Sequence, residues 1–206
     1  MAFLKDSIVP RAYQLAIAAS ALSKGNTLAV LPTGLGKTLI AFLAMEGRAQ
    51  KGRMVFLAPT KPLVQQHFKT FLSSCNFSEE EVSLITGEVS PKNRQALWRK
   101  RVCFSTPQSF QNDIKSGRTD ANCSLCVIDE AHRSVGSYAY TYVAGECAKA
   151  GALLLGLTAS PGGNRQKIQE IVDALGIRNI EIRTATDADV APYVMSLDVS
   201  YIRVPL

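Results

Sequence analysis

Short runs of apolar residues recur seven times along this chain, and segments with helical spacing separate most of them. The runs are continuous rather than alternating, which is typical of strands buried on both faces of a sheet. Because strands that alternate with helices form βαβ units, the pattern predicts an α/β fold with a mainly parallel central sheet and helices on both faces. The predicted strands cover residues 27–31, 54–58, 82–85, 102–105, 125–128, 153–157 and 180–182, and the predicted helices cover residues 11–23, 37–50, 62–74, 91–100, 108–115, 138–149 and 164–175.

The composition indicates a folded protein of one large domain with a tail, since domains hold roughly 150 residues. The chain has 206 residues, of which 47% are hydrophobic and 19% charged, whereas a disordered chain needs low hydrophobicity and high charge. The longest apolar runs, such as 152–157, fall far short of the ~20 residues that span a bilayer. Lys5, Asp6 and Arg11 interrupt the start of the chain, so we expect no secretory signal peptide.

The segment Leu-Pro-Thr-Gly-Leu-Gly-Lys-Thr at 31–38 lies between a predicted strand and a predicted helix, which is the context of a phosphate-binding loop. Gly34 and Gly36 let backbone N–H groups approach phosphate oxygens, and the helix N-terminus favours the same anion. Lys37 would contact the β- and γ-phosphates, and Thr38 would coordinate Mg²⁺. Leu31 departs from the strict pattern, which has glycine there. A glycine-rich turn with a chance Gly-Lys-Thr is the alternative.

Two adjacent carboxylates follow the predicted strand at 125–128, in the sequence Asp-Glu-Ala-His. Asp129 would hold Mg²⁺, partly through water, because that ion dehydrates reluctantly. Glu130 would orient and deprotonate the attacking water. With Lys37, these residues supply the catalytic parts that phosphoryl transfer needs. A helix start with acidic residues in its first turn is the alternative, and the phosphate loop earlier in the chain argues against it.

The two motifs together resemble those of superfamily-two helicases and translocases of the DEAH-box type. Other segments match in the right order: 10–14 resembles the Q motif, 58–64 motif Ia, 86–87 and 106–108 the next two nucleic-acid-contacting motifs, and 157–161 motif III. The resemblance implies a RecA-like P-loop NTPase domain that uses ATP and Mg²⁺.

The same resemblance implies roles for individual residues. Gln14 would read the adenine edge, and His132, Thr158 and Ser160 would couple the state of ATP to nucleic-acid binding. The implied nucleotide contacts are Arg11, Gln14, Pro32, Thr33, Gly34, Leu35, Gly36, Lys37 and Thr38.

Several motifs are longer than the superfamily minimum. LPTGLGKT, APTKPLV, DEAHR and GLTASPG together are similar to the family of archaeal Hef helicase/nucleases and eukaryotic Fanconi anaemia M-type translocases. The resemblance covers about residues 8–204. It implies ATP-dependent remodelling of branched DNA, such as stalled forks and Holliday junctions, with replication or repair proteins as further partners. It also implies a cytoplasmic, nucleoid-associated location in an archaeon or a nuclear one in a eukaryote.

The family pattern also predicts how the chain is divided. Residues 1–185 would form the first RecA-like domain, and 186–206 a linker or the start of a missing insertion or second motor domain. No segment after Ser160 resembles the later motor motifs, so the arginine finger of the second RecA-like domain is missing and the isolated chain should be nearly inactive. Two alternatives stay open: a motor on double-stranded RNA, and a nucleotide-binding module without independent catalysis.

Polar residues that follow predicted strand ends would contact the phosphate backbone of DNA, because open parallel sheets bind ligands at the carboxyl ends of their strands. Backbone contacts give affinity with little sequence information. Residues 1–103 contain 14 Lys and Arg against 6 Asp and Glu, whereas 104–206 contain 9 against 11, so the basic first half favours a polyanionic partner. The predicted DNA contacts are Pro59, Thr60, Lys61, Gly87, Thr106 and Gln108.

Three remaining features are interpreted as structural. The five cysteines predict reduced thiols, with Cys126 as a small apolar residue in a buried strand rather than a zinc ligand. His67 is interpreted as a surface helix residue without a role. The basic run Lys92, Arg94, Arg99, Lys100 and Arg101 is interpreted as a solvated helix face, with Trp98 as the one aromatic candidate for base stacking.

Overall fold

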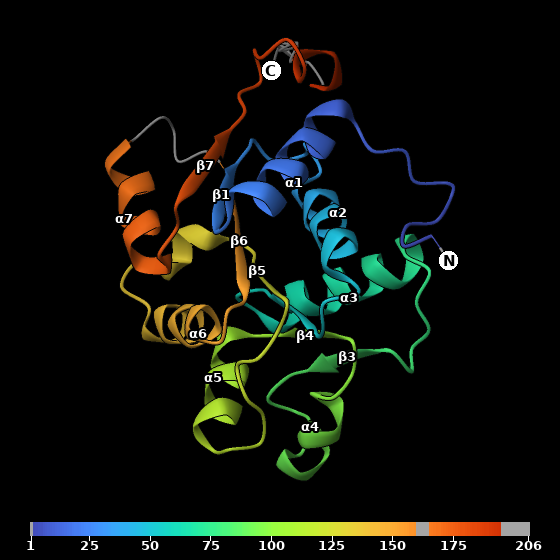
Figure 1. The fold of residues 1–206 in the computed structure, drawn as a ribbon, viewed down its shortest axis with the longest axis vertical. Coiled ribbons are helices and arrows are strands. Elements are labelled where there is room, and N and C mark those ends of the chain that lie inside the picture. Colours follow the sequence, from blue (N-terminus) through green and yellow to red (C-terminus); the bar gives the residue numbers. More distant parts are fainter. Residues whose placement is uncertain (1, 160–164, 195–206) are drawn as a thin grey trace, which may run out of the picture.

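A computed structural model of the chain describes residues 2–159 and 165–194. Its centre is a seven-stranded parallel sheet with the order β3-β4-β2-β5-β6-β1-β7, flanked by helices (Figure 1). Every predicted strand and helix is present, which confirms the predicted fold class. The strands are β1 Thr27–Val30, β2 Met54–Leu57, β3 Val82–Ile85, β4 Val102–Ser105, β5 Leu125–Ile128, β6 Leu153–Thr158 and β7 Asn179–Ile182, and the α-helices are α1 Ala12–Lys24, α2 Lys37–Arg48, α3 Lys61–Ser74, α4 Pro91–Leu97, α5 Pro107–Lys115, α6 Tyr138–Lys149 and α7 Arg165–Leu175.

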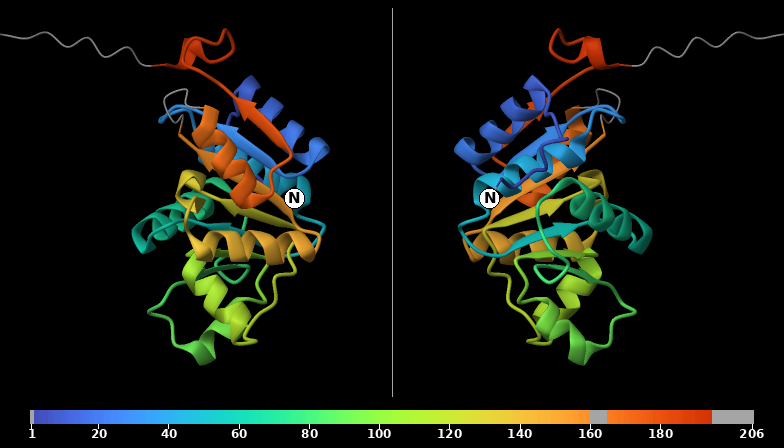
Figure 2. Two further views of the ribbon diagram at one scale, coloured as in Figure 1. Left: turned by 90° about the vertical axis from the view of Figure 1, so that its left-hand side faces the viewer. Right: turned by 90° about the vertical axis from the view of Figure 1, so that its right-hand side faces the viewer.

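Helices cover both faces of the sheet, which explains why the interior strands are predominantly apolar (Figure 2). Helices α1, α2 and α3 pack on one face, where they contact Ala29 and Phe56. Helices α5, α6 and α7 pack on the other face, where the buried strand residues include Leu28 and Val55. These two residues directly precede Ala29 and Phe56 in the sequence. Successive side chains of a strand point to opposite faces. Both sets are therefore buried, and the interior strands have no polar side.

The parallel arrangement gathers the loops that follow the strands at one end of the sheet. The phosphate-binding loop follows β1, the Asp-Glu pair follows β5, and Thr158 ends β6. These three strands are adjacent in the sheet, in the order β5-β6-β1. The loops after β2, β3 and β4 come from the other group of neighbours, β3, β4 and β2. The predicted nucleotide residues therefore lie beside the predicted DNA residues, with β2 and β5 at the boundary between the two groups.

The interpretation of the basic run as a solvated helix face is wrong for Arg94. Helix α4 ends at Leu97, and the Arg94 guanidinium forms a 3.1 Å ion pair with Asp113, whose side chain is fully buried. Asp113 also accepts hydrogen bonds from Trp98 Nε1 at 2.9 Å and Arg118 at 3.1 Å. Trp98 is 1% exposed and stacks on Phe110, so it is not a surface for nucleic-acid bases.

The cysteines are all reduced and buried, as expected. Cys126 lies within β5 and is fully buried, which agrees with its interpretation as a core residue. In the described ranges 2–159 and 165–194, His, Cys, Asp and Glu side chains form no group of three or more that could hold a metal ion. In the same ranges we also find no helix that is both long and apolar enough to cross a membrane.

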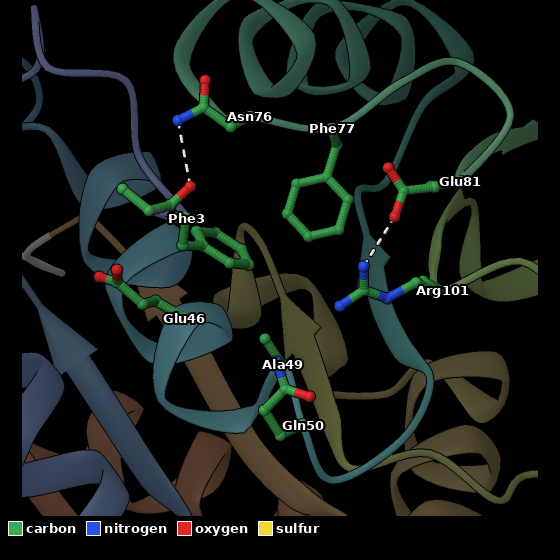
Figure 3. Close-up of a pocket in the computed structure, with 9 residues that line it drawn as sticks. Phe3, Glu46, Ala49, Gln50, Asn76, Phe77, Glu81 and Arg101 are labelled. Carbon is green, nitrogen blue, oxygen red and sulfur yellow. Dashed lines mark hydrogen bonds and ion pairs between the residues drawn. The ribbon is translucent and has the colours of Figure 1, made fainter.

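A cavity of about 320 Å³ opens at the other end of the sheet, beside the residues that precede β3 and β4. The Phe77 ring and the Arg101–Glu81 ion pair lie along its wall (Figure 3). All strands are parallel, so this cavity lies at their amino ends, away from the phosphate-binding loop. Its residues belong to none of the motifs.

The chain continues past β7 toward the phosphate-binding loop. Val190 is fully buried in the same core as α1, and a short 3₁₀ helix, η2, covers Ala191–Tyr193. The predicted boundary at 185/186 stays a prediction, although Val190, which follows it, is part of the core. The sequence 199–204 also predicts an extended segment, and it lies outside the described residues.

Candidate nucleotide site and nucleic-acid surface

The phosphate-binding loop joins the buried strand β1 to helix α2. Gly34 and Gly36 have φ angles of 86° and 70°, in the left-handed region that favours glycine. A Cβ atom on Gly36 would lie 2.5 Å from Gln14 Nε2, so only glycine fits without displacing that side chain. The Lys37 ammonium donates to the carbonyls of Leu31 at 3.2 Å and Pro32 at 3.3 Å and lies across the loop.

Leu31 continues the strand instead of turning out of it. Its N–H donates to the Thr158 carbonyl at 3.1 Å, and its side chain is fully buried. The residue therefore extends the pairing of β1 with β6 and anchors the loop in the core. A buried packing position accounts for leucine where the strict pattern has glycine.

The segment that resembles the Q motif is fastened to the phosphate-binding loop. The Tyr13 hydroxyl and Gln14 Nε2 both donate to the Leu35 carbonyl, at 2.8 and 3.2 Å. Gln14 Oε1 accepts from the Arg11 backbone N–H at 2.9 Å. Gln14 is thus buried and holds the loop in place. Its contact with adenine stays a prediction.

A pocket of about 320 Å³ lies beside the loop. Arg11 and Tyr193 form one side of it, with the guanidinium 4.3 Å from the centre of the tyrosine ring. No motif or spacing pointed to Tyr193, because its contact depends on the chain returning to the phosphate-binding loop after β7. The other lining residues are Pro32, Thr33, Gly34, Leu35, Ala185 and Val194.

Asp129 and Glu130 follow β5 and lie close to Lys37. Burial lowers the pKa of Lys37, while the nearby carboxylates of Glu130 and Asp129 raise it. The Asp129 N–H donates to the Leu57 carbonyl at 2.8 Å, which fixes the start of this loop against β2. Glu130 has φ 50° and ψ 48°, and it is the only non-glycine residue with positive φ in the described ranges. Strained backbone of this kind often marks functional sites.

His67 belongs to this site, so its interpretation as a surface residue without a role is wrong. It lies on α3, and its Nε2 is 2.7 Å from Asp129 Oδ2. Only 10% of each of the two side chains is exposed. A sequence signal existed: Val64, His67 and Phe71 are spaced three and four residues apart, which places them on one buried helix face.

The predicted coupling residues His132 and Thr158 are in contact. His132 lies in the short 3₁₀ helix η1 (Ala131–Ser134), and its Nδ1 is 3.1 Å from the Thr158 hydroxyl oxygen. The same nitrogen is 3.4 Å from a Glu130 carboxylate oxygen. The histidine thus bridges the DEAH loop and the end of β6. Ser160 lies outside the described residues.

The oxygen atoms at this site suit a magnesium ion. Mg²⁺ prefers a few carboxylate or hydroxyl ligands and keeps several waters. Asp129 uses Oδ2 for His67, and no hydrogen bond from the described residues reaches its Oδ1. Thr38, in the first turn of α2, has a hydroxyl oxygen of the kind that Mg²⁺ accepts as a ligand. These residues fit the ion that the motifs predict.

The predicted DNA contacts lie at the carboxyl ends of three neighbouring strands. Thr60 is exposed and is the N-cap of α3, and Lys61 forms an ion pair with Glu88 in the loop after β3. Thr106 is the N-cap of α5, where its side chain accepts from the Ser109 N–H at 3.2 Å. Gly87 and Gln108 are exposed, and Pro59 is half-buried. The six residues therefore share one end of the sheet.

A seven-stranded parallel sheet with a phosphate-binding loop and an Asp-Glu pair at its carboxyl end defines a RecA-like P-loop ATPase domain. Residues 11–168 match the DEAD/DEAH box helicase family, and the chain belongs to this family. The structure is similar to the crystal structure of the Pyrococcus furiosus Hef helicase domain. That comparison gives a TM-score of 0.91 and 46% identity, and it covers 100% of this chain and 45% of that one.

Two curated relatives give the same result at the level of sequence. The DEAD-box ATP-dependent RNA helicase FANCM of Arabidopsis thaliana is 44% identical over 98% of this chain and 16% of its own length. The ATP-dependent DNA helicase mph1 of Neurospora crassa is 41% identical over 93% of this chain and 17% of its own length. The chain therefore spans less than a fifth of the length of these two relatives.

Proposed function

We propose that this chain is the ATP-binding half of a DNA helicase or translocase that remodels branched DNA, such as stalled forks and Holliday junctions, in repair. The observation that carries the proposal is the convergence of Lys37, Asp129 and Glu130 beside a row of exposed strand-end loops. The similarity to the ATP-dependent DNA helicase mph1 supports DNA as the polymer. The protein would act where its DNA is, in the cytoplasm of an archaeon or the nucleus of a eukaryote.

The chemistry would be ATP hydrolysis by positioning and electrostatics. Backbone N–H groups of the loop and the α2 N-terminus would hold the phosphates, and Lys37 would leave its carbonyl partners to meet the β- and γ-phosphates. Thr38 and Asp129 would hold Mg²⁺, which supplies positive charge against the phosphates when bound. Glu130 would orient the attacking water and accept its proton.

The base would occupy the pocket that Arg11 and Tyr193 line on one side. This pocket adjoins the phosphate loop through Gly34 and Leu35, so a nucleotide could span both. An aromatic ring and a guanidinium plane both stack on purines. The pocket thereby favours a nucleotide with its base over a simple polyphosphate.

Nucleic acid would bind across the loops after β2, β3 and β4. Helix N-caps, backbone N–H groups and Lys61 suit phosphate oxygens, so affinity should depend strongly on salt and weakly on sequence. A second RecA-like domain of the full-length protein would close over the site and supply an arginine finger. Replication or repair proteins would be further partners.

The test uses the full-length protein with forked DNA, Mg²⁺ and ATP. Glu130→Gln should abolish hydrolysis while ATP and DNA binding survive, because the substitution removes the base and leaves the phosphate loop intact. Turnover at the wild-type rate in this variant would refute the assignment of Glu130.

RNA is the second candidate polymer, because the name of the Arabidopsis relative is that of an RNA helicase. Strand-end contacts to phosphate do not by themselves distinguish the two polymers. Competition between forked DNA and duplex RNA for the full-length protein would decide: we expect DNA to displace RNA, and the reverse would overturn the proposal.

The isolated 206 residues should behave as a nucleotide-binding module. We expect weak nucleotide binding, very slow hydrolysis and no strand separation, because residues from a second domain complete the catalytic site. Strand separation by this chain alone would contradict the two-domain requirement.

A further inference from the structure

We propose that His67 is a positioning residue for the magnesium-binding carboxylate, and that through α3 it joins the nucleic-acid contacts to the nucleotide site. The inference rests on the proposed function. Its starting point is the 2.7 Å contact between His67 Nε2 and Asp129 Oδ2 inside a largely buried pair. A carboxylate only accepts hydrogen bonds, so Nε2 carries the proton in this contact.

The histidine ring is held in one place by its neighbours. Its centre lies 4.7 Å from that of Phe56 on β2, and Val64 and Phe71 are buried on the same side of α3. The Asp129 backbone is also fixed, because its N–H donates to Leu57 of the same strand. With Oδ2 bound to His67, the carboxylate cannot rotate freely and Oδ1 is left for the ion. Partners of this kind orient metal-binding side chains and tune metal affinity.

Helix α3 connects this carboxylate to the predicted DNA contacts. It begins at Lys61, with Thr60 as its N-cap, and His67 lies six residues after Lys61. At 1.5 Å per residue, about 9 Å of continuous helix separates the two positions. A shift of α3 when Thr60 and Lys61 bind phosphate would therefore move the group that holds Asp129. This route differs from the one through His132 and Thr158, because it uses β2 and α3 rather than β6.

The first experiment measures binding of ADP to this chain as Mg²⁺ is varied. His67→Phe keeps a ring against Phe56 but cannot donate, and His67→Gln keeps a donor. We expect the Mg²⁺ concentration that gives half of the maximal enhancement of ADP binding to rise about tenfold in His67→Phe. It should stay within about threefold of wild type in His67→Gln, because the donor is retained. Lys69→Ala, on the exposed side of α3, is the matched control and should match wild type.

Several outcomes separate this inference from simpler ones. Equal Mg²⁺ dependence in wild type and His67→Phe would overturn it, and so would an equal defect in His67→Phe and His67→Gln. If His67→Phe fails to fold, His67→Met, which fills space without a donor, takes its place. If the wild-type chain binds no ADP at all, the proposed function fails instead.

The second experiment tests the connection through α3 in the full-length protein. The measured quantity is the ratio of the ATPase rate with forked DNA to the rate without it. We expect His67→Phe to lower this ratio at saturating Mg²⁺, while His67→Gln restores most of it. A slower rate with an unchanged ratio would leave the histidine as a metal-site residue and refute the connection to DNA.

Discussion

Glu130 combines a predicted catalytic role with a backbone conformation that most residues avoid. Its φ of 50° is left-handed, which costs a residue with a side chain roughly 1 kcal/mol or more. The conformation starts the 3₁₀ helix η1 and so places His132 against Thr158. The unfavourable backbone conformation of Glu130 therefore lies where the Glu130 carboxylate and the His132 ring are both positioned.

A stability measurement can detect that cost. Glu130→Asn should raise the free energy of unfolding by about 0.5–1 kcal/mol relative to Glu130→Gln, because asparagine adopts the left-handed region more readily. Both variants lack the base and should lose hydrolysis, so activity does not separate them. Urea unfolding with equal m-values is the measurement. Equal stability of the two variants would mean that the backbone here is not strained.

Tyr193 gives a second prediction for a single residue. Tyr193→Ala should weaken ADP binding about tenfold, since base stacking contributes roughly 1–3 kcal/mol. Tripolyphosphate, which has no base, should bind as it does to the wild type, and Tyr193→Phe should keep ADP affinity. Calorimetric titration of the three proteins gives the values. Tighter ADP binding by Tyr193→Ala would show that the ring obstructs the pocket instead of binding the base.

Among the elements, the strands follow most directly from the sequence. The interior strands were predictable because their continuous apolar runs suit strands covered on both faces. The edge strand β7 departs from that reason, since it is Asn-Ile-Glu-Ile and both of its isoleucines are exposed. Helix α4 ends three residues before its predicted end, since Trp98 turns into the core to reach Asp113. The four-residue helix η1 has no periodic signal. His67 and Tyr193 could not be assigned to the site, because their roles depend on which loops the fold brings together.

Asp113 connects several elements through a cluster of ion pairs and hydrogen bonds. This fully buried carboxylate on α5 joins Arg94 of α4, Trp98 and Arg118. Asp113→Ala should lower the free energy of unfolding by about 3–5 kcal/mol, because it leaves buried donors without an acceptor. Asp173→Ala, at an exposed position of α7, should change it by less than about 0.5 kcal/mol. Chemical denaturation of both variants gives the comparison, and similar losses would contradict a special role for Asp113.

At the scale of the whole molecule, five buried thiols report on the integrity of the core. Burial raises the pKa of Cys75 to about 12 and that of Cys103 to about 11. The reactive thiolate is therefore scarce at pH 8 in the folded protein. Iodoacetamide should label the native chain very slowly and label all five cysteines once it is unfolded in urea. Mass spectrometry counts the labels, and rapid native labelling would show that the core opens readily.

The strand order was beyond sequence reasoning, which predicted parallel pairing but not which strands are neighbours. The observed order places the nucleotide loops on β5, β6 and β1 and the predicted DNA loops on β3, β4 and β2. Strand β2 pairs with both β4 and β5 and so belongs to both groups. The proposed role of α3, which follows β2, depends on that position.

The pairing of β1 also has a consequence for synthesis of the protein. Within the described part of the chain, residues 27–30 pair with residues 155–158 on one side and 179–182 on the other. The strand that anchors the phosphate-binding loop is therefore made early and finds its neighbours late. Such distant pairings form slowly and leave apolar segments exposed in the meantime. Until β6 and β7 have been synthesised, the nucleotide site therefore cannot assemble. ATP can assist folding only after nearly all of these residues have emerged.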